Sequence, residues 1–442
     1  MLRTSAENGM FTDSPRRRLL VLLLVLIAFC STVGAKNKRH QSQVVGYFTE
    51  SGAASGKYPV KNIVTSGAAN LLTQLDYAFG HVLDNQCQIA NREVALDHEY
   101  DAASSVDGSA DPQGPNQLRG TFHQLQELKH LYPNLKILIS FGGWGQSEGF
   151  TGAAAPDHLR DFVRSCVQTF IAGHFADGIE GAGIFDGIDI DWEYPVEGGV
   201  HLGRPEDKEN FTALAAEFRR QLDALRPGYL LTAALPAEEE YYKNFELKEI
   251  SKYLDYLSIM AYDLHWNSEP TTNFHSALFH DRADPSKAPL DKRYGDYAVR
   301  GFLQAGVPAE KIIFGVPFYG KGWQGVKDGN HGLYQPAAAP AEAGGSYREL
   351  KNLPPEADRK YSSKAVTCTI LSNATFWSYD CPQALRKKMK YIRHHHLGGV
   401  MFWELSHDSP DLELLHVLAA RTKMASNTNT PARNSSIQKE MR

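Results

Sequence analysis

Runs of apolar and β-branched residues alternate along the chain with stretches whose hydrophobic positions recur every three or four residues. The runs are typical of buried β-strands and the intervening pattern of helices with one buried face, most clearly over 122–131, 162–171 and 211–225. This alternation indicates parallel β/α units, and eight runs favour an α/β fold of the (β/α)8 TIM-barrel type over an open doubly wound sheet. The expected strands are 44–48, 75–82, 136–143, 185–194, 230–237, 254–263, 311–320 and 398–405.

A smaller element is expected between the seventh strand and the eighth, because the connection there is far longer than a barrel needs. Residues 321–388 contain further strand-like pieces at 332–335, 365–370 and 375–380. They predict a small α+β insertion domain within a barrel that covers 43–420. A stretch rich in Gly and Asp, 97–117, predicts a long loop after the second strand.

The two ends of the chain have compositions that differ from the rest. Three arginines precede an apolar run of 12 residues from Leu19 to Cys30, and small residues follow as far as Ala35. This pattern predicts an export signal over 1–35, since the run is too short to cross a bilayer. We therefore expect a secreted protein, extracellular or periplasmic, that keeps no membrane anchor after cleavage. The Asn-, Thr- and Ser-rich segment 425–442 is expected to be disordered.

An exported protein meets an oxidising compartment, so its cysteines can form disulfides. Cys368 and Cys381 are close in sequence and form the expected pair, whereas Cys166 lies on the apolar face of a helix and is expected to be a buried free thiol. No cysteine spacing indicates zinc. The histidines 394–396 end a basic helix, and we interpret them as a solvated helix end and not a metal site.

The fourth expected strand contains three carboxylates at alternate positions, Asp189, Asp191 and Glu193. Side chains alternate between the faces of a strand, so all three point to one side, ~6.6 Å apart. Such a ladder favours shared protons and raised pKa values, which keep a carboxylic acid protonated near neutral pH. Asp186 breaks the alternation and is assigned a structural role.

Aromatic residues gather at the ends of the expected strands, where a barrel places its active site. Trp144 follows the third strand, Tyr262 ends the sixth, Tyr319 the seventh and Trp403 the eighth. Carboxylates surrounded by aromatic faces suit a site that cleaves sugars, because an acid protonates the glycosidic oxygen and rings stack on the sugar faces. A net charge of −5 and a pI of about 6.4 give no sign of nucleic-acid binding.

Three motifs lie on or next to the expected strands, together with Trp403 on strand eight: D-x-x-D-x-D-x-E at Asp186, Asp189, Asp191 and Glu193, S-x-G-G at Ser140, Gly142 and Gly143, and M-x-Y-D at Met260, Tyr262 and Asp263. With these motifs the chain resembles the family 18 glycoside hydrolases, specifically the bacterial-type chitinases that carry an α+β domain between strands seven and eight. The resemblance covers about residues 43–420. One departure is Lys321, in FYGKGW, where those chitinases often have arginine.

The resemblance implies hydrolysis of chitin by a retaining mechanism in which the N-acetyl oxygen of the substrate is the nucleophile. Glu193 would be the general acid and base, Asp191 would orient the acetamido group, Asp189 would tune Asp191, and Tyr262 would bind the acetamido oxygen. No metal or cofactor is implied, and we expect a monomer whose partner is chitin or its oligosaccharides. The substrate-binding residues are expected to be Asp263, Met260, Trp403, Trp144, Tyr319, Tyr47 and Phe79.

Alternatives remain for the site and for the function. The acidic ladder could hold magnesium or calcium, Trp144 and Tyr47 could be core residues, and the S-x-G-G residues could serve mainly close packing. The chain could instead be an endo-β-N-acetylglucosaminidase acting on N-glycans, which shares the acidic motif, or a non-catalytic chitin-binding lectin. Lectin-like members of the family typically lack the acid, and Glu193 is present.

Overall fold

The computed structural model describes residues 42–176, 178–341 and 345–420. The predicted export signal over 1–35 and the predicted disordered segment 425–442 lie outside the described residues. Within the described ranges, no helix has both the length and the apolar character needed to cross a membrane.

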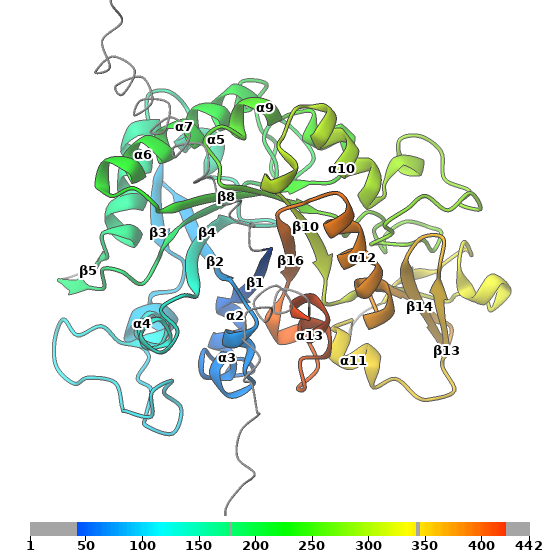
Figure 1. The fold of residues 1–442 in the computed structure, drawn as a ribbon, viewed down its shortest axis with the longest axis horizontal. Helices are drawn as coiled ribbons and strands as arrows, with labels where there is room; N and C mark the ends of the chain where they lie inside the picture. The colour runs from blue at the N-terminus through cyan, green and yellow to red at the C-terminus, as the bar shows by residue number, and fades with distance from the viewer. Residues whose placement is uncertain (1–41, 177, 342–344, 421–442) are drawn as a thin grey trace, which may run out of the picture. The chain divides into compact units, whose positions relative to one another are not determined.

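In the described part of the chain, parallel strands follow one another around a closed barrel, and each expected strand corresponds to one of them (Figure 1). The first and last strands pair, and the first also pairs with the second, so the barrel has no open edge among its eight strands. The predicted TIM-barrel fold is thereby confirmed. Its strands are β1 (Gln43–Thr49), β2 (Gln74–Leu83), β4 (Lys136–Gly142), β7 (Gly187–Asp191), β8 (Leu230–Pro236), β9 (Tyr256–Met260), β10 (Ile312–Pro317) and β16 (Gly399–Trp403).

Helices surround the barrel, and their apolar faces pack on the outside of the strands (Figure 1). The three helices expected from the hydrophobic pattern are present as α4 (Gly120–Leu131), α6 (Leu159–Cys166) with the π-helical turn Val167–Ile171, and α7 (Asp207–Leu225). Two antiparallel additions were not predicted: β3 (Gln86–Ile89), which pairs with β2, and the small pair β5 (His174–Ala176) and β6 (Ile179–Glu180). The helices are α2 (Glu50–Ala54), α3 (Lys61–Thr65), α4 (Gly120–Leu131), α5 (Phe150–Ala153), α6 (Leu159–Cys166), α7 (Asp207–Leu225), α8 (Glu239–Tyr242), α9 (Leu247–Ile250), α10 (Gly295–Gln304), α11 (Tyr347–Lys351), α12 (Pro382–His394) and α13 (Glu413–Ala419).

Strand β7 shows how the alternation of side chains separates the packing core from the barrel interior. Ile188 and Ile190 are buried in the cluster between strands and helices, together with Trp192, whose ring stacks on Phe150 with centroids 5.2 Å apart. The alternate residues face the interior, as the sequence pattern predicts. The barrel interior has a separate apolar cluster that includes Tyr262.

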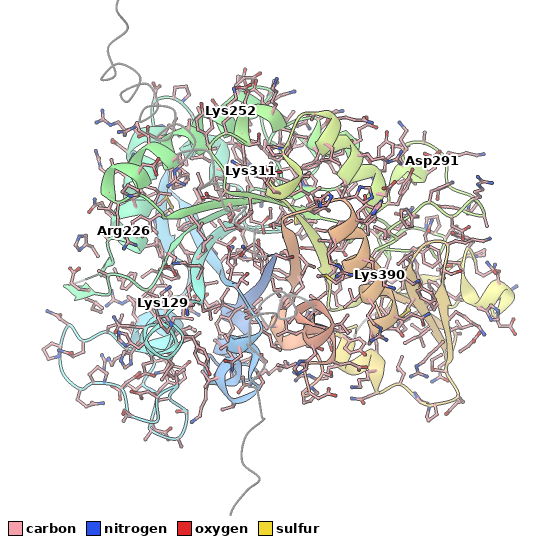
Figure 2. All side chains as sticks on the ribbon, viewed as in Figure 1. Lys129, Arg226, Lys252, Asp291, Lys311 and Lys390 are labelled. Atoms are coloured by element: carbon pink, nitrogen blue, oxygen red, sulfur yellow. A yellow bond between two sulfur atoms is a disulfide. The ribbon has the colours of Figure 1, made fainter. Side chains whose placement is uncertain are left out.

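Asp186 lies at the other end of this strand and is held by its neighbours. Its carboxylate forms ion pairs with Lys129 and, at 3.1 Å, with Lys136, and it accepts a hydrogen bond from the backbone amide of Ile137 at 3.0 Å. Figure 2 labels Lys129 on α4, so this carboxylate connects a helix to two strands. These contacts agree with the structural role assigned to Asp186.

The expected insertion lies between β10 and β16 and contains an antiparallel sheet in the order β12-β11-β15-β14-β13. Two of its strand-like pieces, 365–370 and 375–380, correspond to β14 and β15, but 332–335 is not a strand. The chain turns there, with positive φ at Asn330, His331 and Tyr334. The strands are β11 (Gly320–Gln324), β12 (Ala339–Pro340), β13 (Asp358–Ser362), β14 (Thr367–Ser372) and β15 (Thr375–Tyr379).

Two disulfides are present in the described residues, one predicted and one not. Cys368 pairs with Cys381 as expected. Cys166 is fully buried, but the expectation of a free thiol is wrong, because it is bonded to Cys87 with Cα atoms 4.8 Å apart. Cys87 lies on β3, and this unpredicted strand brings the thiol against α6 across a sequence separation of 79 residues.

A buried ion pair joins α12 to the residue that follows β15. Lys388 and Asp380 are 1% and 0% exposed, and the Lys388 ammonium also donates to the backbone oxygen of Ser276 at 2.6 Å. Asp380 further accepts a hydrogen bond from the Ser276 hydroxyl at 3.1 Å. Burying the two charges costs desolvation free energy. Removing only one of them is strongly destabilising, because the other would remain buried without a partner.

We expect Lys388→Met to lower the free energy of unfolding by about 3–5 kcal/mol, because Asp380 would lose its cationic partner. Calorimetric melting temperatures would measure the loss. The double variant Lys388→Met/Asp380→Leu should recover part of it, since no unpaired charge remains. A double variant no more stable than the single one would show that lost packing, and not the unpaired charge, causes the destabilisation.

Candidate active site

A cleft of about 760 Å³ opens at the carboxyl ends of the barrel strands. Side chains from the ends of β1, β2, β7, β9 and β16 line it, together with residues of the connecting loops. Of the predicted site residues, Asp189 alone does not line the cleft and lies deeper. The predicted residues in the lining are Glu193, Asp191, Tyr262, Asp263, Met260, Trp403, Trp144, Tyr319, Tyr47 and Phe79.

Asp189 is 1% exposed and is surrounded by hydroxyl donors from three strands. Its carboxylate accepts hydrogen bonds from Tyr47 at 2.8 Å, Ser140 at 2.7 Å and Thr232 at 2.5 Å. Burial raises its pKa, and these hydrogen bonds oppose that shift. Ser140 therefore does more than allow close packing, and Tyr47 combines a place in the cleft wall with a bond to the ladder.

Asp191 differs sharply from its neighbour, although both are aspartates on one face of one strand. It is 4% exposed, and its Oδ1 atom has no hydrogen-bond partner among the described residues. Its pKa is raised well above the usual value by burial, and further by the charges of Glu193 and Asp189. A buried, unsatisfied carboxyl oxygen is costly, and such atoms gather at functional sites.

The glycines of the S-x-G-G motif let the third strand approach the acidic ladder, as expected. A Cβ at Gly142 would lie 2.2 Å from the backbone oxygen of Asp191, and one at Gly143 would lie 2.5 Å from the ring of Phe79. Both residues have positive φ, and the Gly143 amide donates to the Asp191 backbone oxygen at 2.8 Å. A larger side chain at Gly142 would collide with the strand that carries the ladder, and one at Gly143 would collide with the Phe79 ring in the cleft wall.

Glu193 lies just beyond the end of β7 in the cleft wall, and the residue is 8% exposed. Burial raises its pKa to about 8, with smaller contributions from the charges of Asp263 and Glu238 and an opposing hydrogen bond with Tyr194. The side chain is therefore protonated at neutral pH, which is the state a general acid requires.

Asp263 has the opposite protonation state. Burial alone would raise its pKa, but His275 and Lys321 lower it below the usual value. Its carboxylate lies 3.2 Å from the Lys321 ammonium and 3.4 Å from His275 Nδ1, and it accepts a hydrogen bond from Tyr319 at 2.8 Å. The cleft thus holds a protonated carboxyl and an ionised one, an arrangement common in acid–base sites.

Tyr262 directs a hydroxyl into the same space with little competition from the protein. Its Oη atom lies 3.7 Å from Met401 Sδ, which is a weak acceptor, and the residue is 9% exposed. Burial raises the pKa of Tyr262 most, and the charges of Asp191 and Glu193 raise it further. The phenol therefore keeps its proton and can donate a hydrogen bond to a ligand.

Aromatic rings form two surfaces in the cleft. Trp403 stacks on Phe79 with centroids 5.7 Å apart and planes at 15°, and Tyr47 packs beside it. Nearer the rim, Trp144 is 47% exposed and packs against Trp266 at 5.1 Å. Exposed, rigid rings of this kind suit the apolar faces of sugars.

Several residues of the site were not predicted from the sequence. Trp266 and Glu238 line the cleft, and the Lys321 ammonium lies 4.0 Å above the Trp266 ring. Asp76, which is 2% exposed, extends the buried carboxylates below Asp189 and raises the pKa of Asp191. Glu238 follows the end of β8 by two residues, so the search for polar residues at strand ends could have found it.

The described residues contain no group of three or more His, Cys, Asp or Glu side chains placed to hold a metal ion. The deepest carboxylate of the ladder is already engaged by protein hydroxyls. On α12, the last turn ends at His394, and this residue and His396 are exposed.

Comparison with known proteins gives one consistent result. The model of the glycosyl hydrolases family 18 matches residues 43–408. Chitinase C of Streptomyces lividans is 36% identical over 376 residues, which cover 83% of this chain and 57% of that protein. More generally, the chain spans 57–60% of the length of several curated relatives that it matches.

Solved structures agree with the sequence comparison. The catalytic domain of psychrophilic chitinase B from Arthrobacter TAD20 has a TM-score of 0.82 at 34% identity, covering 88% of this chain and 96% of that one. A family 18 N-acetylglucosaminidase from Paenibacillus barengoltzii has a TM-score of 0.67 at 28% identity, covering 86% and 99%.

Proposed function

Because the chain belongs to the glycosyl hydrolases family 18, we propose that it hydrolyses the β-1,4 linkages between N-acetylglucosamine units of chitin. The observation that carries the proposal is the pair formed by Asp191, buried with an unpartnered oxygen, and Glu193, protonated beside it. The chitinases among its relatives support chitin as the substrate. The aromatic surfaces of the cleft suit a chain of sugars.

In the proposed reaction, Glu193 protonates the glycosidic oxygen while the acetamido oxygen of the same substrate attacks the anomeric carbon. The bond to the leaving sugar breaks, and a positively charged oxazolinium ring forms. Asp191 faces the acetamido N–H and stabilises the charge of the ring. Glu193, now ionised, removes a proton from water, which opens the ring and restores the N-acetyl group.

The remaining residues position the reacting sugar. The Tyr262 hydroxyl donates to the acetamido oxygen and places it for attack. Asp189 is fixed by its hydroxyl donors. Its negative charge raises the pKa of Asp191 and so tunes the protonation of that carboxyl. Trp403 forms the floor beneath the sugar, and Asp263 accepts hydrogen bonds from its hydroxyl groups. Interactions aimed at the developing charge stabilise the transition state more than the substrate.

The pKa of Glu193 predicts the alkaline limit of activity. The carboxyl is protonated below its pKa of about 8 and ionised above it. We therefore expect kcat/KM on an uncharged chitin oligomer to fall as the pH rises through about 8, because the acid has lost the proton that it must donate. A profile that already falls above about pH 5 would show an ordinary carboxyl pKa.

Product analysis tests the proposed function directly. The protein would be incubated with a chitin hexamer and, separately, with an N-glycoprotein, and the products identified by mass spectrometry. We expect short N-acetylglucosamine oligomers and intact glycoprotein. Release of N-glycans alone would indicate an endo-β-N-acetylglucosaminidase, and binding of the hexamer without cleavage would indicate a lectin.

We further propose that the mature protein is exported and monomeric. The disulfides Cys87–Cys166 and Cys368–Cys381 support export, since such bonds persist in oxidising compartments. Mass spectrometry of the secreted chain should find an N-terminus near Lys36, and light scattering should give the mass of one chain. A chain retained with Leu19–Cys30 intact would contradict export with cleavage.

A further inference from the structure

Glu238 is a carboxylate of the cleft to which the proposed reaction gives no role. It precedes α8, lines the cleft and is only 8% exposed. Its side chain accepts a hydrogen bond from its own backbone amide. Elsewhere in the described residues, no side chain or amide donates a hydrogen bond to its carboxylate, although the amides of Tyr241 and Tyr242 donate to its backbone oxygen.

The nearby cations are already bound to other groups. Arg293 is close enough to lower the pKa of Glu238, but its Nε and Nη2 atoms both bond to Glu240, at 3.0 and 2.6 Å. The Lys321 ammonium is paired with Asp263. Arg293 therefore acts on Glu238 through its charge, but among the described residues no ion pair or hydrogen bond joins a cationic side chain to the Glu238 carboxylate.

The other carboxyl groups that line the cleft are protonated, bonded to protein groups or assigned a role in the proposed reaction. Asp263 is paired, Glu193 is protonated, and Asp191 faces the acetamido group in the proposed reaction. Glu50 accepts the Tyr77 hydroxyl at 2.8 Å. Glu238 is thus the carboxylate of this lining with capacity for a positively charged part of a substrate.

We propose that Glu238 binds the ammonium group of a glucosamine unit next to the cleaved N-acetylglucosamine, so that the enzyme prefers partially deacetylated chitin. The inference rests on the proposed function, which supplies the sugar chain in the cleft. The ligand chemistry is an amino sugar within a β-1,4 polymer, whose amine is cationic and small.

The position of Glu238 places this contact beside the bond that is cleaved. Its charge contributes to the raised pKa of both Glu193 and Tyr194. The Tyr241 backbone amide donates to the Glu238 backbone oxygen at 3.0 Å, and the Tyr241 ring stacks on that of Tyr194, the residue after Glu193, with centroids 5.6 Å apart. Both rings line the cleft. A sugar that touches Glu238 is therefore a neighbour of the one that reacts.

The electrostatics of Glu238 suit a ligand that brings its own charge. Burial raises its pKa to about 7; Arg293 lowers it, and Glu240 and Asp263 raise it. An ammonium group at hydrogen-bond distance favours the ionised form and replaces the solvation lost on burial. A neutral acetamido group supplies no such compensation.

The test compares two substrates and two variants. The substrates are the fully acetylated chitin hexamer and hexamers with one glucosamine unit, and kcat/KM is measured for each near pH 7. Glu238→Gln removes the charge and keeps the shape. Glu239→Gln removes the same charge from the next residue, which is exposed and does not line the cleft.

We expect the wild-type protein to prefer a singly deacetylated hexamer, and Glu238→Gln to lose that preference by about tenfold, the loss expected for one charge-assisted hydrogen bond. The ratio of kcat/KM on the two hexamers is the readout, because loss of the Glu238 charge also removes a contribution that raises the pKa of Glu193 and so affects both substrates alike. Glu239→Gln should behave as the wild type. Unchanged melting temperatures would show that the variants fold. Equal losses on both substrates, or no preference in the wild type, would overturn the proposal.

A binding measurement keeps this inference separate from the proposed function. In protein carrying Glu193→Gln, calorimetry would compare the affinities of the two hexamers with and without Glu238→Gln. Tighter binding of the deacetylated hexamer that depends on Glu238 supports the ammonium contact even if turnover fails. If the protein cleaves the acetylated hexamer but its binding of the deacetylated hexamer does not depend on Glu238, the proposed function stands and the ammonium contact is wrong.

Discussion

Glu193→Gln is expected to reduce turnover of a chitin hexamer by at least ~10²–10⁴-fold while leaving substrate binding in place. The amide keeps the shape of the side chain and its place beside Tyr194, but it cannot donate the proton that the leaving sugar needs. The residual rate in single-turnover experiments would measure the loss, because product release then plays no part.

Binding is the control for this prediction. Quenching of tryptophan fluorescence reports occupancy, since Trp144 and Trp403 both line the cleft. The dissociation constant for the hexamer should stay within about threefold of the wild-type value, because removal of the proton donor takes away an interaction of the transition state and not of the substrate. Wild-type turnover in this variant would show that another group is the acid.

The acidic ladder was predictable because one physical rule governs it. A strand alternates its side chains, so three carboxylates at alternate positions must share a face whatever the rest of the chain does. The residues between the carboxylates must point to the opposite face. They do, since Ile188, Ile190 and Trp192 pack against the helices. The eight strands and the main helices follow from the same local periodicities.

The different states of the three carboxylates were not predictable, because they depend on distant strands. Asp189 is satisfied by hydroxyls of Tyr47 on β1, Ser140 on β4 and Thr232 on β8. Asp191, two residues further along, has an oxygen without a partner. Which residues oppose each carboxylate is set by the barrel register, and no local pattern encodes that register.

The missed elements have weak hydrophobic patterns. Strand β13, with the sequence DRKYS, lies at the edge of the insertion sheet and is mostly polar, as edge strands often are. Strand β3 is short and polar as well. Without β3 nothing placed Cys87 near Cys166, so the sequence could not reveal that disulfide.

The N-acetyl group of the substrate should be indispensable at the cleaved unit, because in the proposed reaction it is the nucleophile. Fully deacetylated chitosan should therefore not be cut at a measurable rate. This requirement is compatible with a glucosamine unit bound at Glu238, since that unit neighbours the one that reacts. Incubation of the protein with fully deacetylated polymer, and analysis of chain length over time, gives the answer.

The stereochemistry of the product tests the same step independently. The acetamido oxygen closes the ring on one face of the anomeric carbon and water opens it from the other, so two inversions give net retention. Proton NMR of freshly formed product should show the β-anomer first. A thiazoline that mimics the oxazolinium ring should inhibit competitively, since it resembles a species close to the transition state.

Asp191→Ala should weaken inhibition by the thiazoline, because the buried carboxyl that faces the charged ring would be gone. Asp186→Asn is a matched control, since Asp186 belongs to the same motif but binds Lys129 and Lys136 away from the cleft. Inhibition of that variant should be unchanged once its melting temperature shows that it is folded. An initial α-anomer, or brisk cleavage of fully deacetylated chitosan, would mean that the nucleophile comes from the protein or from water.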